Sequence, residues 1–260
     1  MRPLQGRHAV VTGGGTGIGL AVAHALAGLG AAVTVMGRRA EPLEAAVEAL
    51  RAEHEAEAQA VPCDVTDEAR VGRAFAQARA GLGPVAVLVN NAGAARSAPF
   101  LKTGADLWGA MLAVNLTGAF LCTRAALPDM LEGGFGRVVS VASTAGLTGY
   151  PYVAAYCAAK HGLVGMTRAL ALETARTGVT VNAVCPGFTD TDLIAESVRT
   201  ISAKTGRGAD EARGALAAHN PQGRLVAPSE VAEAVAWLCL PSAQSMTGQA
   251  IAVAGGEVMP

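Results

Sequence analysis

A tyrosine and a lysine four residues apart, Tyr156 and Lys160, are the residues of this 260-residue chain whose types and spacing most directly suggest chemistry. They begin a long stretch with a helical pattern, and this spacing places both side chains on one face of a helix. A nearby ammonium favours a phenolate, so we expect Lys160 to lower the pKa of Tyr156. The pair would then exchange a proton with a carbinol or carbonyl oxygen. A surface tyrosine packed on a lysine stem would produce the same pattern, so other segments must decide.

The segment that would hold a cofactor lies near the N-terminus. An apolar stretch at residues 8–11 leads into a glycine-rich turn and then into an alanine-rich helical stretch. This order is typical of dinucleotide-binding folds, because glycines let the backbone approach a pyrophosphate whose charge the helix N-terminus meets. The alternative is a plain tight turn. The predicted cofactor-binding residues of this segment are Gly13, Gly15, Thr16, Gly17, Ile18 and Gly19.

The residues after the second predicted strand indicate which dinucleotide is bound. Folds that take NAD usually place an acidic residue there to bind the ribose 2′-hydroxyl. This chain has Arg38 and Arg39 instead, and its first acidic residue is Glu41. A guanidinium can pair with a 2′-phosphate in a bidentate fork, so the sequence predicts NADP(H) rather than NAD(H). The alternative is a solvated basic turn before a helix.

Strands and helices alternate along the whole chain, without a linker or a low-complexity segment. This alternation predicts an α/β fold, a single domain over residues 1–260 built on one doubly wound parallel sheet. Within it, residues 192–225 are irregularly helical and are expected to form a substrate lid. The predicted strands are residues 8–11, 31–36, 60–63, 85–89, 136–141, 179–184 and 249–253.

Polar residues at the ends of these strands are further candidates. Asp64 follows the third strand and would accept a hydrogen bond from adenine or cap the next helix. The fourth strand ends in residues 90–93, Asn-Asn-Ala-Gly, where doubly wound sheets bind ligands. Asn115 lies in an apolar stretch, and its amide needs partners whether its role is structural, catalytic or both.

Composition and charge exclude several classes of function. The net charge is −1 with dispersed Lys and Arg, so neither a nucleic acid nor a membrane surface is an expected partner. No apolar run is long enough to span a membrane, and the N-terminus lacks a signal-peptide pattern. The five scattered cysteines are typical of reduced thiols in a cytoplasmic protein. Cys157 is not a predicted nucleophile, and the histidines lack ligand spacing, so no metal site is expected.

Taken together, the motifs resemble those of the short-chain dehydrogenase/reductase family over essentially the full length. The matching pieces, in order and at matching intervals, are Thr12-Gly13-x3-Gly17-x-Gly19, Asn90-Asn91-Ala92-Gly93, Asn115, Ser143, Tyr156-x3-Lys160 and Pro186-Gly187. The resemblance implies a Rossmann-like sheet of about seven strands. It also implies a homotetramer, or a homodimer, assembled through the helices around Asn115 and Tyr156.

The resemblance also assigns roles to single residues. Tyr156 would exchange the proton, and Lys160 would lower its pKa and bind the nicotinamide ribose. Ser143 would polarise the carbonyl, and Asn115 would hold a water molecule. Thr189 replaces the family's common aliphatic residue, and residues 254–256 lack the aspartate often found at the C-terminal interface. The remaining residues implied to contact the cofactor are Asp64, Val65, Asn91, Ala92, Gly93, Pro186, Gly187, Thr189 and Thr191.

Two subgroups of the family are the most similar, and they suggest the substrate. The segments at 172–178 and 186–188 resemble ketoreductases of β-ketoacyl thioesters and aromatic polyketides, whereas chain length and lid resemble 3-hydroxybutyrate dehydrogenases. The second group holds a carboxylate with polar side chains where this chain has Ala95, Ala145 and Val153. We therefore expect an NADPH-dependent ketoreductase acting on a small-molecule ketone, most plausibly a β-ketoacyl thioester. The alternatives are an oxidative 3-hydroxyacyl, 3-hydroxybutyrate or secondary alcohol dehydrogenase and, more remotely, a non-catalytic dinucleotide sensor.

Overall fold

A seven-stranded sheet forms the centre of the protein. The computed structural model describes residues 2–259, apart from the side chain of Lys204. All neighbouring strands are parallel, in the order β3-β2-β1-β4-β5-β6-β7, which confirms the predicted doubly wound fold. The strands are β1 (His8–Thr12), β2 (Ala32–Gly37), β3 (Ala58–Pro62), β4 (Val85–Asn90), β5 (Gly136–Val141), β6 (Val179–Pro186) and β7 (Ala250–Val253).

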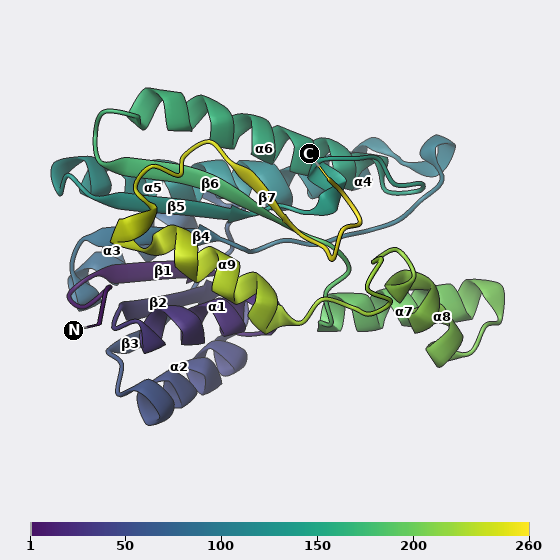
Figure 1. Ribbon diagram of the computed structural model, residues 1–260, viewed down its shortest axis with the longest axis horizontal. Coiled ribbons are helices and arrows are strands. Elements are labelled where there is room, and N and C mark those ends of the chain that lie inside the picture. Colours follow the sequence, from purple (N-terminus) through teal and green to yellow (C-terminus); the bar gives the residue numbers. More distant parts are fainter. Residues whose placement is uncertain (1, 260) are drawn as a thin grey trace.

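Helices cover both faces of this sheet (Figure 1). Helices α1, α2 and α9 pack on one face, and α3, α5 and α6 pack on the other, with α4 against α6. Helices α7 and α8 project beyond these layers (Figure 1). The bounds are α1 (Gly17–Gly28), α2 (Ala40–His54), α3 (Glu68–Leu82), α4 (Ala105–Leu112), α5 (Gly118–Glu132), α6 (Ala154–Thr174), α7 (Asp192–Thr205), α8 (Ala209–Ala217) and α9 (Pro228–Cys239).

The apolar strand sequences follow from burial on both faces. Val11, Val35 and Val89 point into the core under α1, α2 and α9, while Val10 and Leu88 point into the core under α3 and α5. Parallel strands covered on both faces read as continuous apolar runs for this reason. The strand order reverses between β1 and β4. In doubly wound sheets, the crevice that binds ligands lies at such a point, outside the carboxyl ends of the strands.

Residues 113–117 form a π-helical turn, η2 (Ala113–Thr117), that joins α4 and α5 into one continuous helix. An 18-residue window of Ala105–Glu132 has a mean hydropathy of 1.4, so a stretch of membrane-span length does exist. Core helices of water-soluble proteins meet the same criteria, and 44% of this window is buried in the fold.

The predicted lid region contains two helices with a small core of their own. Ile194, Val198, Ala212 and Leu225 are buried against one another, so this unit has fixed packing rather than an irregular course. Leu193 is 38% exposed and lies outside that core. Whether these helices close over a substrate stays a prediction.

Candidate active site

The glycine-rich turn between β1 and α1 is shaped for close approach of a ligand. Gly13 and Gly17 have φ angles of +66° and +55°, a region that side chains disfavour. A Cβ on Gly19 would lie 2.1 Å from the Gly13 carbonyl oxygen, so only glycine fits there. Helix α1 begins after Thr16 without a side-chain cap and without an acidic residue in its first turn. Its free N–H groups therefore suit a pyrophosphate, and the residues present fit a dinucleotide.

The Asn-Asn-Ala-Gly segment is fixed to this turn by hydrogen bonds. The Thr12 hydroxyl accepts from the backbone N–H groups of Asn91 and Ala92, each at 3.0 Å. The Asn91 amide donates to the carbonyl oxygens of Thr12 (2.9 Å) and Gly13 (3.2 Å). Asn91 thus binds the two strand ends together, and its polar atoms hold the glycine turn in place.

Arg38 and Arg39 lie exposed at the end of β2, as the NADP(H) prediction requires. Asp64 follows the neighbouring strand β3, and its carboxylate accepts from the N–H and hydroxyl of Thr66. These hydrogen bonds are the main cause of its lowered pKa, with a smaller contribution from the charge of Arg38. The expectation that Asp64 caps the next helix is wrong, because Asp67 accepts from the Arg70 N–H and caps α3.

Tyr156 faces Ser143 across the crevice. Ser143 lies between β5 and the 3-10 turn η3 (Thr144–Gly146), and its hydroxyl accepts from the Ala145 N–H at 3.1 Å. The expectation that the Tyr156 pKa is lowered is wrong for the protein without its cofactor: burial raises that pKa to about 12, and the nearby Ser143 hydroxyl offsets this only in part. Tyr156 is therefore a protonated phenol at neutral pH.

Lys160 is buried one turn further along α6. Its side chain is 4% exposed, and its Nζ donates to the Val141 carbonyl oxygen at 2.8 Å. The same Nζ lies 5.6 Å from the centre of the Tyr156 ring, so the two side chains share a face as predicted. Burial lowers the Lys160 pKa to about 8. Keeping the Lys160 side chain protonated is thus costly. When it is protonated, its charge lies close enough to act on the Tyr156 phenol.

Asn115 is held by the π-helical turn. Its amide donates to the carbonyl oxygens of Met111 (3.0 Å) and Ala94 (2.8 Å), and its Oδ1 accepts from the Ala94 N–H (3.3 Å). A Cβ on Gly93 would lie 2.8 Å from Asn115 Oδ1 and 3.8 Å from Lys160 Nζ. Gly93 therefore separates these two groups, and π-turns of this kind are frequent at functional sites.

The loop after β6 closes the other side of the crevice. Thr191 immediately precedes α7, and its methyl group lies 3.3 Å from the position of a Cβ on Gly17, so the loop reaches the glycine turn. Thr189 is buried, and its hydroxyl donates to the Gly187 carbonyl oxygen at 3.0 Å. Pro186 is the last residue of β6, so this loop begins directly after it.

A polar cluster beside the crevice was not predicted from the sequence. The Tyr150 hydroxyl lies 2.5 Å from Glu257 Oε1 and 2.8 Å from the Thr144 hydroxyl, next to Ser143. The other carboxylate oxygen of Glu257 is buried and has no hydrogen-bond partner among residues 2–259, and it lies 2.7 Å from the position of a Cβ on Gly187. Tyr150 and Glu257 are 107 residues apart, so no local motif could have revealed the contact.

Fold and site together define a dinucleotide-dependent oxidoreductase, with a phosphate-binding turn, a 2′-phosphate-type basic pair and a tyrosine, serine and lysine at one crevice. The sequence model of the short chain dehydrogenase family matches residues 7–202. The chain belongs to the short-chain dehydrogenase/reductase family and is an enzyme of that family.

Relatives and a solved structure agree with this membership. A Streptomyces coelicolor protein assigned as a ketoacyl reductase is 44% identical over 95% of both chains. The D-beta-hydroxybutyrate dehydrogenase of Cupriavidus necator is 37% identical over 98% of this chain and 99% of its own. A point variant of actinorhodin polyketide ketoreductase, crystallised with NADPH, superimposes with a TM-score of 0.93 at 43% identity, over 96% of this chain and 97% of its own.

The lowered Lys160 pKa predicts how stability depends on pH. The unfolded chain keeps this proton up to about pH 10.5 and the folded chain releases it near pH 8, so unfolding takes up a proton between these values and stability rises with pH. From pH 8 to pH 10 the free energy of unfolding of the cofactor-free protein should increase by about 2 kcal/mol relative to that of Lys160→Met. Urea denaturation across this range measures it. Lys102→Met, at an exposed lysine, is the control, and an equal pH dependence of the wild type and Lys160→Met would contradict the prediction.

Proposed function

We propose that this enzyme is an NADPH-dependent ketoreductase whose preferred substrate is a β-ketoacyl thioester or a related polyketide-like ketone. The observation that carries the proposal is that Tyr156 lies close enough to Ser143 for the serine to lower its pKa, beside the buried Lys160. This arrangement supplies a proton and two hydroxyl groups at one point. Carbonyl reduction needs both where negative charge develops on the oxygen.

The residues of the site have distinct parts in the reaction. Bound NADPH supplies the hydride for the carbonyl carbon. Tyr156 donates its proton to the carbonyl oxygen as charge develops there, and Ser143 donates a hydrogen bond to the same oxygen. Lys160 is positively charged below its pKa of about 8 and stabilises the phenolate that Tyr156 becomes. The Val141 carbonyl oxygen holds Lys160 in position, and Asn115 holds a water molecule that links Lys160 to solvent.

The raised pKa of Tyr156 favours the reductive direction. A phenol with a pKa of about 12 is fully protonated at neutral pH and is ready to act as an acid. Oxidation of an alcohol needs the phenolate, which burial disfavours. The exposed Arg38 and Arg39 support the same direction, because NADPH generally serves reduction.

The cofactor-binding residues are proposed as follows. The glycine turn and the N-terminus of α1 hold the pyrophosphate, and Arg38, with Arg39, pairs with the 2′-phosphate. The remaining contacts are those expected above: Asp64 and Val65 at the adenine; Asn91, Ala92 and Gly93 along its ribose; Tyr156 and Lys160 at the nicotinamide ribose; and Pro186, Gly187, Thr189 and Thr191 at the nicotinamide and phosphates.

A 3-hydroxybutyrate dehydrogenase is the second candidate, supported by the relative from Cupriavidus necator. A small carboxylate needs polar partners, and Ala95, Ala145 and Val153 provide none at the places where that subgroup is expected to have them. The ketoreductase with a larger, less polar substrate is therefore preferred.

We also propose that the chain forms a homotetramer, or a homodimer, through α4, α5 and α6, in the cytoplasm. Trp108, Phe120 and Leu172 on these helices are 40%, 45% and 81% exposed, and exposed apolar groups on neighbouring helices are typical of an interface. The five cysteines are free thiols, as in reducing compartments. Light scattering from the purified protein measures the oligomeric state, and a monomer would contradict the proposal.

The experiment that tests the function compares substrates and cofactors directly. Initial rates of reduction are measured for an acetoacetyl thioester, a bicyclic ketone and an aryl ketone, each with NADPH and with NADH, and for oxidation of 3-hydroxybutyrate. We expect reduction with NADPH to have the highest kcat/KM. A higher value for 3-hydroxybutyrate oxidation would instead support the second candidate, and a strong NADH preference would overturn the assignment of Arg38.

Removal of the Tyr156 hydroxyl tests its role as the acid. Tyr156→Phe should lower kcat by roughly 100- to 10,000-fold, because a general acid contributes about that much. NADPH binding, followed by fluorescence, should persist. Tyr152→Phe removes an equivalent hydroxyl from a side chain that is 66% exposed, and it should keep wild-type turnover. Unchanged kcat in Tyr156→Phe would refute the assignment.

Removal of the Arg38 guanidinium tests the 2′-phosphate contact. Arg38→Ala should raise the KM for NADPH by roughly 10- to 100-fold, since hydrogen bonds between charged groups contribute about 1.5–3 kcal/mol. The KM for NADH, which lacks that phosphate, should change little. Arg73→Ala, at an exposed arginine on α3, should leave both values unchanged. Equal effects of Arg38→Ala on both cofactors would contradict the assignment.

A further inference from the structure

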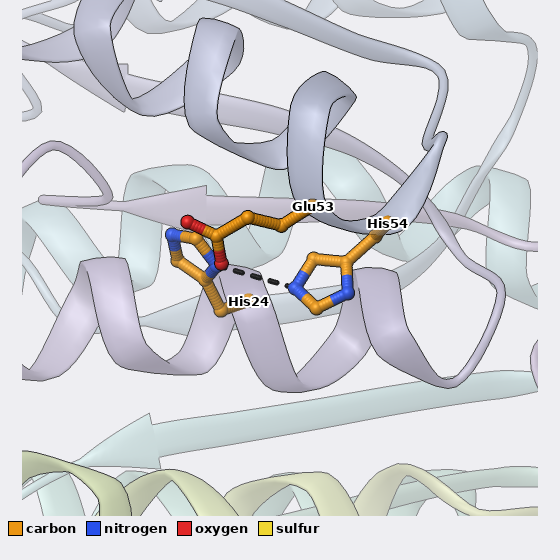
Figure 2. Close-up of side chains that lie close together, drawn as sticks. All are labelled: His24, Glu53 and His54. Atoms are coloured by element: carbon orange, nitrogen blue, oxygen red, sulfur yellow. Dashed lines mark hydrogen bonds and ion pairs between the residues drawn. The ribbon is translucent and has the colours of Figure 1, made fainter.

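Three side chains of metal-ligand type meet between α1 and α2, away from the crevice. His24 comes from α1, and Glu53 and His54 come from the last turn of α2 (Figure 2). The sequence predicted no metal site, because His24 and His54 are 30 residues apart and no local spacing links them. In the fold, however, the packing of α1 against α2 brings the two histidines together, so the lack of a local spacing does not exclude a metal site.

The distances among these side chains match those of a bound metal ion. His24 Nδ1 lies 3.2 Å from His54 Nε2 and 3.2 Å from Glu53 Oε2. In a tetrahedral zinc site with Zn–N and Zn–O distances of about 2.0–2.1 Å, neighbouring ligand atoms are about 3.3–3.4 Å apart. All three ligand atoms lie within 4.8 Å of one another, and the 61% exposed side chain of Glu53 is free to shorten the third distance.

The orientation of the two imidazole rings also suits a shared ion. Their planes make an angle of 71° and their centres are 5.3 Å apart, so the rings meet edge to face and one nitrogen of each approaches the other (Figure 2). Each ring nitrogen in this contact is a lone-pair donor once its proton is on the other nitrogen of the ring. The competing explanation is a direct hydrogen bond between the rings, which uses one proton and no metal.

The packing of both helices fixes the ligands in advance. Val22 and Leu26 of α1 and Val47 and Leu50 of α2 are buried in the same core, so neither helix is free to rotate its ligands away. A ligand set on rigid helices loses little entropy when an ion binds.

The local charge is also suited to a cation. The site lies at the C-terminus of α2, where unpaired carbonyl groups favour positive charge, and Glu53 adds a carboxylate. Arg2 and Arg51 are positively charged neighbours that oppose cation binding. Arg2 donates to the His54 carbonyl oxygen at 3.1 Å and Arg51 donates to the Ala58 carbonyl oxygen at 2.7 Å.

We propose that His24 Nδ1, His54 Nε2 and the Glu53 carboxylate bind a divalent first-row metal ion, with Zn²⁺ the best match and a water molecule as fourth ligand. Two imidazoles and a carboxylate form a ligand set that zinc accepts. The ion ties α1 to α2. His54 ends α2 about 21 Å from the helix start beside Arg39, so the metal acts on stability rather than on hydride transfer.

Zinc binding by the purified full chain, freed of metal with a chelator, tests the proposal. Titration calorimetry should show one Zn²⁺ per chain. The double variant His24→Gln/His54→Gln should bind at least roughly tenfold more weakly, because two of three ligands are removed. At a hundredfold excess of Zn²⁺ over Kd, the Tm of the wild type should rise by about 5 °C or more, and that of the double variant should not.

The control addresses another place where zinc could bind. Cys157 and His161 are one turn apart on α6, and His161 is exposed, so His161→Gln should bind Zn²⁺ like the wild type. Loss of binding in His161→Gln, an affinity of the double variant within about twofold of wild type, or no binding at millimolar Zn²⁺ would each overturn the proposal. Glu53→Gln, at an exposed position, serves if the double variant fails to fold, and it should also weaken binding.

Discussion

The site depends on holding one ammonium group inside the protein. Lys160 is almost completely buried, and its Nζ is paired with the carbonyl oxygen of Val141, the last residue of β5. Because an unpaired buried charge is very costly, this contact fixes where α6 can lie relative to the strand. Tyr156, one turn earlier on α6, is thereby aligned with Ser143, which follows β5 by two residues. One charge in the core therefore sets the position of the other two groups.

The parallel sheet supplies the second requirement, a place where strand ends and a helix N-terminus meet. The hydroxyl of Thr12 at the end of β1 holds the backbone of Asn91 and Ala92 after β4, and the Asn91 amide returns two hydrogen bonds to the glycine turn. Buried polar groups that are fully paired in this way make a rigid network. The glycine-rich turn after β1 and the Asn-Asn-Ala-Gly segment after β4 are thus parts of one hydrogen-bonded unit.

Most of the fold could be predicted from the sequence, because local patterns carry it. The candidate site residues also come from local patterns, and their roles stay predictions. Apolar runs gave the strands to within about two residues, and the interval between Tyr156 and Lys160 gave their common face. The features that the sequence did not reveal depend on burial or on contacts between segments that are distant in the chain. Spacing says nothing about desolvation, which raises the Tyr156 pKa, and the π-turn at Asn115 has no periodicity of its own. The pairing of Tyr150 with Glu257 joins segments that only the folded chain brings together.

The raised pKa of Tyr156 and the lowered pKa of Lys160 have the same main cause, which is the burial of both groups away from water. Each pKa shift favours the neutral form of its own group. Before the reaction, the site therefore holds a neutral phenol beside an ammonium that loses its proton more easily than a free lysine does. The two ionised forms stabilise each other once the phenol has given up its proton, because opposite charges attract strongly where water is excluded. In the proposed reaction, burial therefore does not work against the chemistry: it would keep the proton on Tyr156 until a developing oxyanion takes it, and Lys160 would then compensate the charge left behind.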